Sequence, residues 1–189
     1  MANRTLSIIN RIMNFHASRS NDFRSPIVRG MARAEQARSR ILTDDELRAV
    51  WKATADYPVF GPLLRFILLT ATRRNEAGLM RWSELTDRTW IIPAARYKSN
   101  HDHLVPLSSL ALSQLPERNG EFVFSRNGGV EAIGSYDWHK RVIDERSGVR
   151  GWVIHDVRRT ARSLLSRAGI PPDHAERCLG CDPRRPWDL

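Results

Sequence analysis

Four cationic or titratable side chains stand where the chain turns or where a helix starts, and their types suit the binding of a phosphate group. Arg73 lies where one helical pattern breaks and the next begins, and Lys98 lies in a polar turn between two β-like segments. His155 and Arg158 are spaced i and i+3 at a helix start, which puts them on one face. Because arginine grips phosphate oxygens with a planar fork of donors, these four residues form the candidate catalytic set.

Each member of this set also has a simpler interpretation when it is taken alone. Arg73 and Arg158 could be surface arginines, Lys98 could be a solvated turn lysine, and His155 could cap its helix. Glu76 fits a structural partner better than a catalytic acid. The spacing of the whole set, rather than any one residue, therefore has to support the chemical interpretation.

The overall charge favours a polyanionic partner. The 189 residues include 30 lysines and arginines against 21 acidic residues, for a formal net charge of +9 and an isoelectric point near 10.6. Lysine occurs only at Lys52, Lys98 and Lys140, so arginine supplies nearly all of the positive charge. Such a balance most often accompanies nucleic-acid binding, although solvated arginine faces or a GC-rich genome could also produce it.

The sequence favours a cytoplasmic, nucleoid-associated protein without metal or cofactor. It has no signal-peptide pattern and no apolar run of about 20 residues that could span a membrane. Cys178 and Cys181 form a CxxC pair near His174, which could suggest zinc or a redox dithiol. No second ligand pair accompanies it, so we expect no metal site. No cofactor is predicted either.

Composition and periodicity divide the chain into four segments. Residues 5–17 have helical periodicity, and we interpret residues 1–17 as the helical remnant of a preceding domain. Residues 18–40 are polar and arginine-rich and suggest a basic linker. Residues 41–180 form the main domain, and residues 181–189 form an aberrant tail.

The main domain is expected to be mainly α-helical with a small antiparallel β-sheet, an α+β class. Thr43 and Glu46 form a capping box that starts a helix, and an almost wholly apolar helix begins near Pro62. Two β-like segments, 90–93 and 104–107, suggest a hairpin. Further expected elements are a short strand at 122–124 and helices at 108–115, 135–145, 156–168 and 174–179.

The motifs in this domain resemble those of the tyrosine site-specific recombinases, the phage and prophage integrases. Residues 70–76 and 80–82 match a first box of the form Thr-Gly-x-Arg-x-x-Glu followed by Leu-x-Trp, with Ala71 for the usual glycine. Lys98 precedes a matching His-x-Val-Pro-Leu strand at 103–107. Residues 155–160 match His-x-Leu-Arg-Arg/His-Thr. The resemblance covers about residues 41–180, and the order and spacing of the motifs make it specific. It implies that residues 1–17 are the remnant of a core-DNA-binding domain.

This resemblance implies a role for each residue of the candidate set. In the family, a tyrosine attacks a DNA phosphate and forms a 3′-phosphotyrosine. Arg73, Arg158 and His155 would stabilise the charge on the phosphate oxygens, and Lys98 would protonate the leaving oxygen. The partners implied are double-stranded DNA and other integrase protomers. The candidates for contact with the DNA backbone are Arg74, Arg159 and Arg162.

The match fails at the nucleophile. The family places a tyrosine roughly nine or ten residues after a Leu-Gly-His box, whereas Leu179-Gly180 is followed here by Cys181 and a tail without tyrosine. The three tyrosines all lie upstream, at Tyr57, Tyr97 and Tyr136. A shift of reading frame after Gly180 could produce this tail, a hypothesis that the gene sequence decides. The domain would then be a recombinase fold incomplete at its C-terminus, in a chain truncated at both ends.

The sequence therefore predicts a catalytically defective integrase fragment that binds the DNA backbone but does not cleave strands by itself. Three alternatives remain open. The chain could be an active recombinase that borrows a tyrosine from a partner, or a non-catalytic DNA-binding protein that modulates a full-length integrase. It could also be a fragment that is unstable in the cell.

Overall fold

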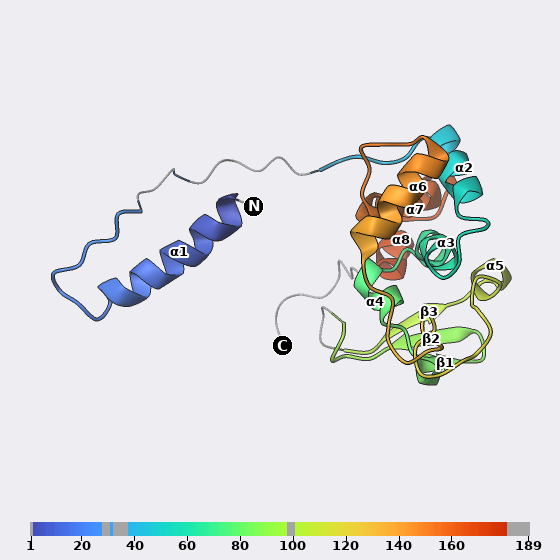
Figure 1. Cartoon of the computed structure of the whole chain (residues 1–189), viewed down its shortest axis with the longest axis horizontal. Helices are drawn as coiled ribbons and strands as arrows, with labels where there is room; N and C mark the ends of the chain where they lie inside the picture. Colours follow the sequence, from blue (N-terminus) through green and yellow to red (C-terminus); the bar gives the residue numbers. More distant parts are fainter. Residues whose placement is uncertain (1, 28–30, 32–37, 98–100, 181–189) are drawn as a thin grey trace. The chain divides into compact units, whose positions relative to one another are not determined.

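In the computed structural model, residues 2–27, 31, 38–97 and 101–180 are described. The chain divides into two units, residues 1–39 and residues 40–189 (Figure 1). The first unit contains one helix, α1 (Ala2–Ala17), followed by a turn in which His16 packs edge-on against Phe23. Several large apolar residues of α1 remain exposed, namely Ile8, Ile9, Ile12 and Phe15.

The second unit is built from seven α-helices and three short strands in its described part. The helices are α2 (Asp44–Ala53), α3 (Phe60–Thr70), α4 (Arg74–Gly78), α5 (Ser109–Leu112), α6 (Tyr136–Ser147), α7 (Ile154–Arg167) and α8 (Pro172–Cys178). The strands β1 (Leu85–Thr86), β2 (Thr89–Ile92) and β3 (His103–Pro106) form one antiparallel sheet in the order β1-β2-β3. The prediction of a mainly α domain with a small antiparallel sheet is confirmed.

The first helix of this unit starts where the sequence predicts. The Thr43 hydroxyl accepts a hydrogen bond from the Glu46 N–H at 3.3 Å, and the Glu46 carboxylate accepts one from the Thr43 N–H at 2.9 Å. These reciprocal bonds satisfy two donors that a helix N-terminus otherwise leaves unpaired. The guanidinium of Arg40 also binds Glu46, so the chain that enters the domain is attached to this cap.

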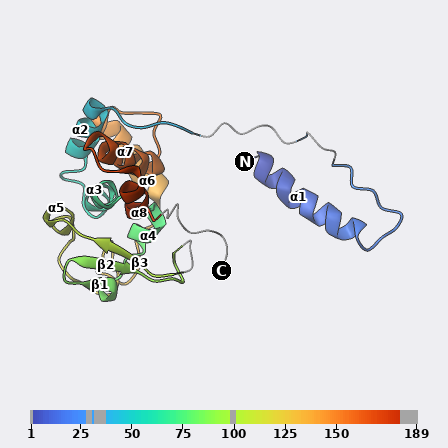
Figure 2. The same cartoon turned by 180° about the vertical axis from the view of Figure 1, so that it is seen from behind.

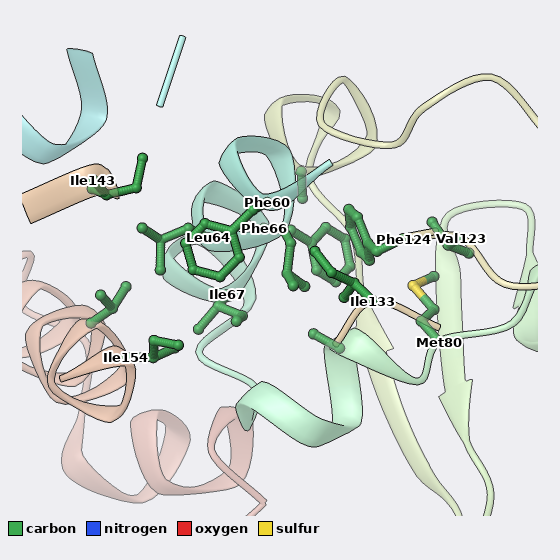
Figure 3. Packing of buried hydrophobic residues seen from close by; sticks show 14 of the residues in the cluster. Phe60, Leu64, Phe66, Ile67, Met80, Val123, Phe124, Ile133, Ile143 and Ile154 are labelled. Atoms are coloured by element: carbon green, nitrogen blue, oxygen red, sulfur yellow. The ribbon is translucent and has the colours of Figure 1, made fainter. Parts of the chain in front are cut away.

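Helix α3 is the centre of the core. It lies between the layer of helices α2, α6 and α7 and the sheet in both views of the molecule (Figure 1 and Figure 2). Figure 3 shows Leu64 and Ile67 on the side of Ile143 and Ile154, whereas Phe66 lies on the side of Phe124. Most residues of this apolar helix are buried, as is typical of a helix that is apolar on most of its faces, and α3 thereby joins the two layers.

Several local predictions differ from the structure; among them, the helix expected at 108–115 spans only Ser109–Leu112. Residues 122–124 do not form a strand; Phe122 makes only an isolated bridge with Arg81. The backbone N–H groups of Phe122 and Val123 donate to the carbonyls of Gly129 and Met80, neither of which belongs to a strand. The central helix begins at Phe60 instead of near Pro62. In its first turn, Gly61 packs so closely on the Thr54 carbonyl that a Cβ atom would not fit.

The hairpin of β2 and β3 extends toward the segment that contains Lys98. Its register pairs Trp90 with Val105 and Ile92 with His103. The residues 98–100 lie outside the described part of the chain, so the predicted position of Lys98 stays a prediction. Among the helices that the structure describes, none has the length and apolar character required to cross a bilayer.

Candidate active site

Arg73 is held in place at the turn between α3 and α4. The backbone N–H of Arg73 donates to one oxygen of the Glu76 carboxylate at 2.8 Å, and its Nη1 donates to the other at 2.6 Å. Glu76 is only 5% exposed, so water competes little for these bonds. The interpretation of Glu76 as a structural partner is confirmed by this geometry, which fixes both the backbone and the guanidinium of Arg73.

Ala71 gives this turn its shape. It adopts the left-handed conformation with φ 53°, which a glycine reaches without steric cost and an alanine does not. On either side of it, the hydroxyls of Thr70 and Thr72 bond to each other at 2.8 Å. The left-handed backbone at this position explains why the matching family motif usually has glycine here.

Arg158 is buried and anchors the turn from helix α7. Its Nη1 donates to the carbonyl oxygen of Ala71, and its Nη2 donates to the carbonyl oxygen of Leu179 at 2.6 Å. Ala71, Leu179 and Ala161 also form a small apolar cluster beside it. Arg158 is therefore not the surface arginine that the sequence left open, because it joins the first box to the end of α8.

His155 lies in the first turn of α7 and stays exposed, three residues before Arg158. Partial removal of water from its ring, followed by the charges of Arg159 and Arg158, lowers the pKa of His155. This shift favours the neutral form of the ring, which offers one N–H donor. Helix α7 begins two residues earlier than the sequence suggested, since Asp156 caps it by accepting from the Val153 N–H at 2.9 Å.

Arg73 and His155 line the same open cavity, of about 630 Å³. Its walls come from the start of α4, from α6 and from the chain that enters α7. In both views α4 lies beside α6 (Figure 1 and Figure 2). The cavity thus brings together two of the four candidate residues, which are 82 positions apart in the sequence, and both are donors to an anion.

Tyr97 and His103 were not among the candidate residues, and the structure places both next to the site. Tyr97 is 4% exposed and its hydroxyl donates to the Gly180 carbonyl at 2.9 Å. The guanidinium carbon of Arg73 lies 5.7 Å from the centre of its ring, and the ring of His103 stacks on it at 4.6 Å. Burial raises the pKa of Tyr97 and lowers that of His103.

One signal in the sequence could have identified these residues. Tyr97 directly precedes Lys98 in the sequence, and His103 opens the His-x-Val-Pro-Leu motif that follows it. Through its hydrogen bond to the Gly180 carbonyl, Tyr97 links the chain after β2 to the end of α8.

The three arginines predicted to contact the DNA backbone have different surroundings. Arg159 pairs with Asp156 at 3.0 Å, and Arg162 pairs with Glu176 at 2.7 Å. Arg74 lies in the wall of the cavity, 4.6 Å above the ring of Tyr136. The structure therefore brings only Arg74 of these three into the cavity with Arg73.

The CxxC pair is only partly described. Cys178 is exposed and has a free thiol, whereas Cys181 lies outside the described residues. In the part of the chain that the structure covers, no group of three His, Cys, Asp or Glu side chains gathers in the way a metal site needs.

Comparison with known proteins gives matches at three levels. Residues 40–182 match the model of the phage integrase family. The prophage integrase IntA of Escherichia coli (strain K12) is 39% identical over 126 residues, which are 62% of this chain and 30% of that protein. The chain thus spans about a third of the length of this curated relative.

Solved structures share the fold. A lambda integrase tetramer bound to a Holliday junction matches with a TM-score of 0.69 and 19% identity, over 96% of this chain and 59% of that one. The XerA recombinase matches with a TM-score of 0.63 and 16% identity, over 91% and 65% of the two chains. The catalytic domain of bacteriophage HP1 integrase matches with a TM-score of 0.60 and 19% identity, over 74% of this chain and 79% of that one. At these identities the likeness supports the fold alone.

Proposed function

The chain belongs to the phage integrase family of tyrosine recombinases, and we propose that its second unit binds the backbone of double-stranded DNA at a recombinase active site. One observation carries this proposal: Arg73 and His155, from separate helices, open into one cavity. The integrases that share this fold include a tetramer on a Holliday junction and a dimer on a core site.

In this proposal two groups hold the DNA phosphate, and a third supports them. Arg73, positioned by Glu76, and the neutral N–H of His155 donate to the phosphate oxygens from the cavity. Arg158 does not line the cavity, but its positive charge acts on His155, and its bond to the Ala71 carbonyl keeps the turn before Arg73 in place. Donors placed in advance where charge develops are worth about 10²–10³ in rate each. Lys98 remains the proposed general acid.

We further propose that the 189-residue chain does not cleave DNA by itself. No tyrosine follows Gly180 in the sequence. Tyr57 is buried with its hydroxyl 2.7 Å from Nδ1 of His139, and the hydroxyl of Tyr136 packs on Gly78. Tyr97 is near Arg73, but its hydroxyl donates to the Gly180 carbonyl and its raised pKa opposes the phenolate that an attack requires.

A gel-shift titration at graded salt tests DNA binding. Backbone contacts release counterions, so the affinity should fall steeply and linearly on a logarithmic salt scale. A binding curve that salt does not move would contradict the proposal. The chain should also unfold cooperatively on heating, as an unstable fragment would not.

A half-site substrate that traps covalent intermediates tests the missing cleavage. The chain alone should give no covalent protein–DNA adduct. An adduct that disappears in Tyr97→Phe would identify Tyr97 as the nucleophile and refute this part of the proposal. If a tyrosine is supplied in trans, an added full-length integrase whose own phosphate-binding arginines are substituted should become attached to the DNA through its tyrosine. That adduct should require this chain and should be lost when Arg73 of this chain is substituted.

If the chain binds DNA and forms no adduct under either condition, it acts as a non-catalytic DNA-binding protein. It could then modulate a full-length integrase by competing for its sites. In every case we expect it to act in the cytoplasm, where the nucleoid lies.

A further inference from the structure

The cavity beside Arg73 is larger than a single phosphate group requires. Its volume of about 630 Å³ falls in the range of sites that take whole small molecules. Arg73 and His155 occupy one part of the wall. Helix α6 supplies another part, which takes no role in the phosphate binding proposed above. The part of the wall that includes α6 therefore has room for a second group.

Two arginines of this wall have no carboxylate partner among the residues that the structure describes. Arg74 bonds only to the side-chain oxygen of Asn75, at 3.1 Å, and lies over the Tyr136 ring. Arg141, on α6, makes no ion pair with a described residue. Both are exposed, so both can turn toward a bound anion without breaking a salt bridge.

The other charged groups leave the wall with a net positive charge, because one cation and one carboxylate pair with each other and a single carboxylate remains. Lys140 binds Asp144 at 2.7 Å, so these two charges neutralise each other. Asp137 is the remaining carboxylate, one helical turn before Arg141. Its negative charge weakens an anion site but does not cancel two arginines.

We propose that Arg74 and Arg141 bind the phosphate adjacent to the one held by Arg73 and His155. Phosphates follow one another every 3.4 Å or so along the helix axis of each DNA strand, so a strand whose phosphate meets Arg73 must place a neighbouring phosphate close by. The cavity holds both. This inference rests on the proposed function, and it assigns a positioning role to Arg141, which no sequence motif indicated.

The matched experiment compares two double variants with the same loss of charge. Arg74→Gln with Arg141→Gln removes the pair in the cavity, and Arg48→Gln with Arg118→Gln removes two exposed arginines that do not line it. Each lost phosphate contact lowers the salt slope by about one unit. The cavity variant should therefore lose at least one unit of slope, equally on two duplexes of unrelated sequence, while the control variant keeps the wild-type slope.

The opposite variant gives an independent result. Asp137→Asn removes the carboxylate that opposes the anion, so it should tighten DNA binding by roughly twofold to fivefold at low salt, the range of a fraction of a kcal/mol to about 1 kcal/mol between exposed charges. This result is lost in the triple variant that also carries Arg74→Gln and Arg141→Gln. Thermal unfolding of each variant confirms that it is folded.

The failures are distinguishable. If the wild type binds DNA but both double variants behave alike, the cavity site is refuted and the proposed function stands. The same holds if Asp137→Asn has no effect. If the wild type shows no salt-sensitive binding, both the proposed function and this inference fail.

Discussion

The guanidinium of Arg158 donates a hydrogen bond of 2.6 Å to the carbonyl oxygen of Leu179. A second branch of the same guanidinium reaches Ala71, so one buried cation joins the turn before Arg73 to the end of α8. A residue expected to meet DNA therefore also stabilises the fold, and its substitution has to be interpreted with both roles in mind.

We expect Arg158→Ala to lower the free energy of unfolding by about 2–4 kcal/mol, because two buried carbonyls lose their donor. Chemical denaturation measures this. Arg162→Ala is the control one turn along α7, since Arg162 pairs with Glu176 at the surface and such pairs contribute about 1 kcal/mol or less. Equal losses for the two variants would contradict the anchoring role of Arg158.

Glu76→Gln should release Arg73. The amide can still accept one hydrogen bond, but it loses the charge that holds the guanidinium, so we expect a loss of stability of about 1–3 kcal/mol together with weaker DNA binding. Glu121→Gln is the control, because Glu121 pairs with Arg81 at an exposed site. If Glu76→Gln lowered stability but left DNA affinity unchanged, Arg73 would not need Glu76 for binding.

Substitutions of Ala71 should separate strain from packing. Ala71→Gly relieves the left-handed strain, worth about 1–2 kcal/mol, but it loses a buried methyl and adds unfolded-state freedom, each worth about 0.5–1 kcal/mol. The net change should therefore stay within about 1 kcal/mol. Ala71→Val should destabilise by more than about 2 kcal/mol, since a β-branched residue fits φ 53° poorly. Thermal unfolding that ranks valine with glycine would argue against the observed turn.

Stability should fall as the pH decreases below about 6.5. His139 is 3% exposed, bonds to Tyr57 and stacks on Phe60, and burial followed by the charge of Arg126 lowers its pKa. Below the pKa of the unfolded state, about 6.5, the unfolded chain takes up a proton that the folded chain does not. The loss therefore begins near pH 6.5 and continues down to the folded pKa.

His139→Gln tests this pH dependence. The free energy of unfolding, measured by urea denaturation between pH 7.5 and pH 5, should change less with pH in the variant than in the wild type. Some slope should remain, because the pKa values of His103 and His155 are also lowered. An unchanged slope in His139→Gln would show that His139 is not a source of the effect.

The sequence predicted the parts of this fold that depend on local rules. The capping box at Thr43 is a pattern of neighbouring residues, and so is the i and i+3 spacing of His155 and Arg158 on α7. The partners of Arg158 could not be found in this way, because Ala71 is 87 residues away and the contact depends on how α3 and α7 pack. The apolar pattern of residues 122–124 also could not show that these residues have no neighbouring strand to pair with.

The sequence predicted a set of site residues, whereas only the structure shows the cavity that two of them line. Arg73 and His155 were identified because they match family motifs. Arg141 lies in no motif and became a candidate only when α6 was seen beside α4. Tyr97 was noted as a tyrosine in the wrong place for a nucleophile, and its bond to Gly180 gives it a structural part in the site.

Gly180 has φ 66°, and a Cβ atom there would coincide with the hydroxyl of Tyr97. This residue consequently acts as a fixed departure point: its carbonyl is held by the hairpin, and the residue before it is held by Arg158. The backbone at the end of α8 is thus tied to two separate elements, through the Gly180 carbonyl to the hairpin and through the Leu179 carbonyl to α7. A change in the packing of either element would therefore be transmitted to the backbone at Gly180.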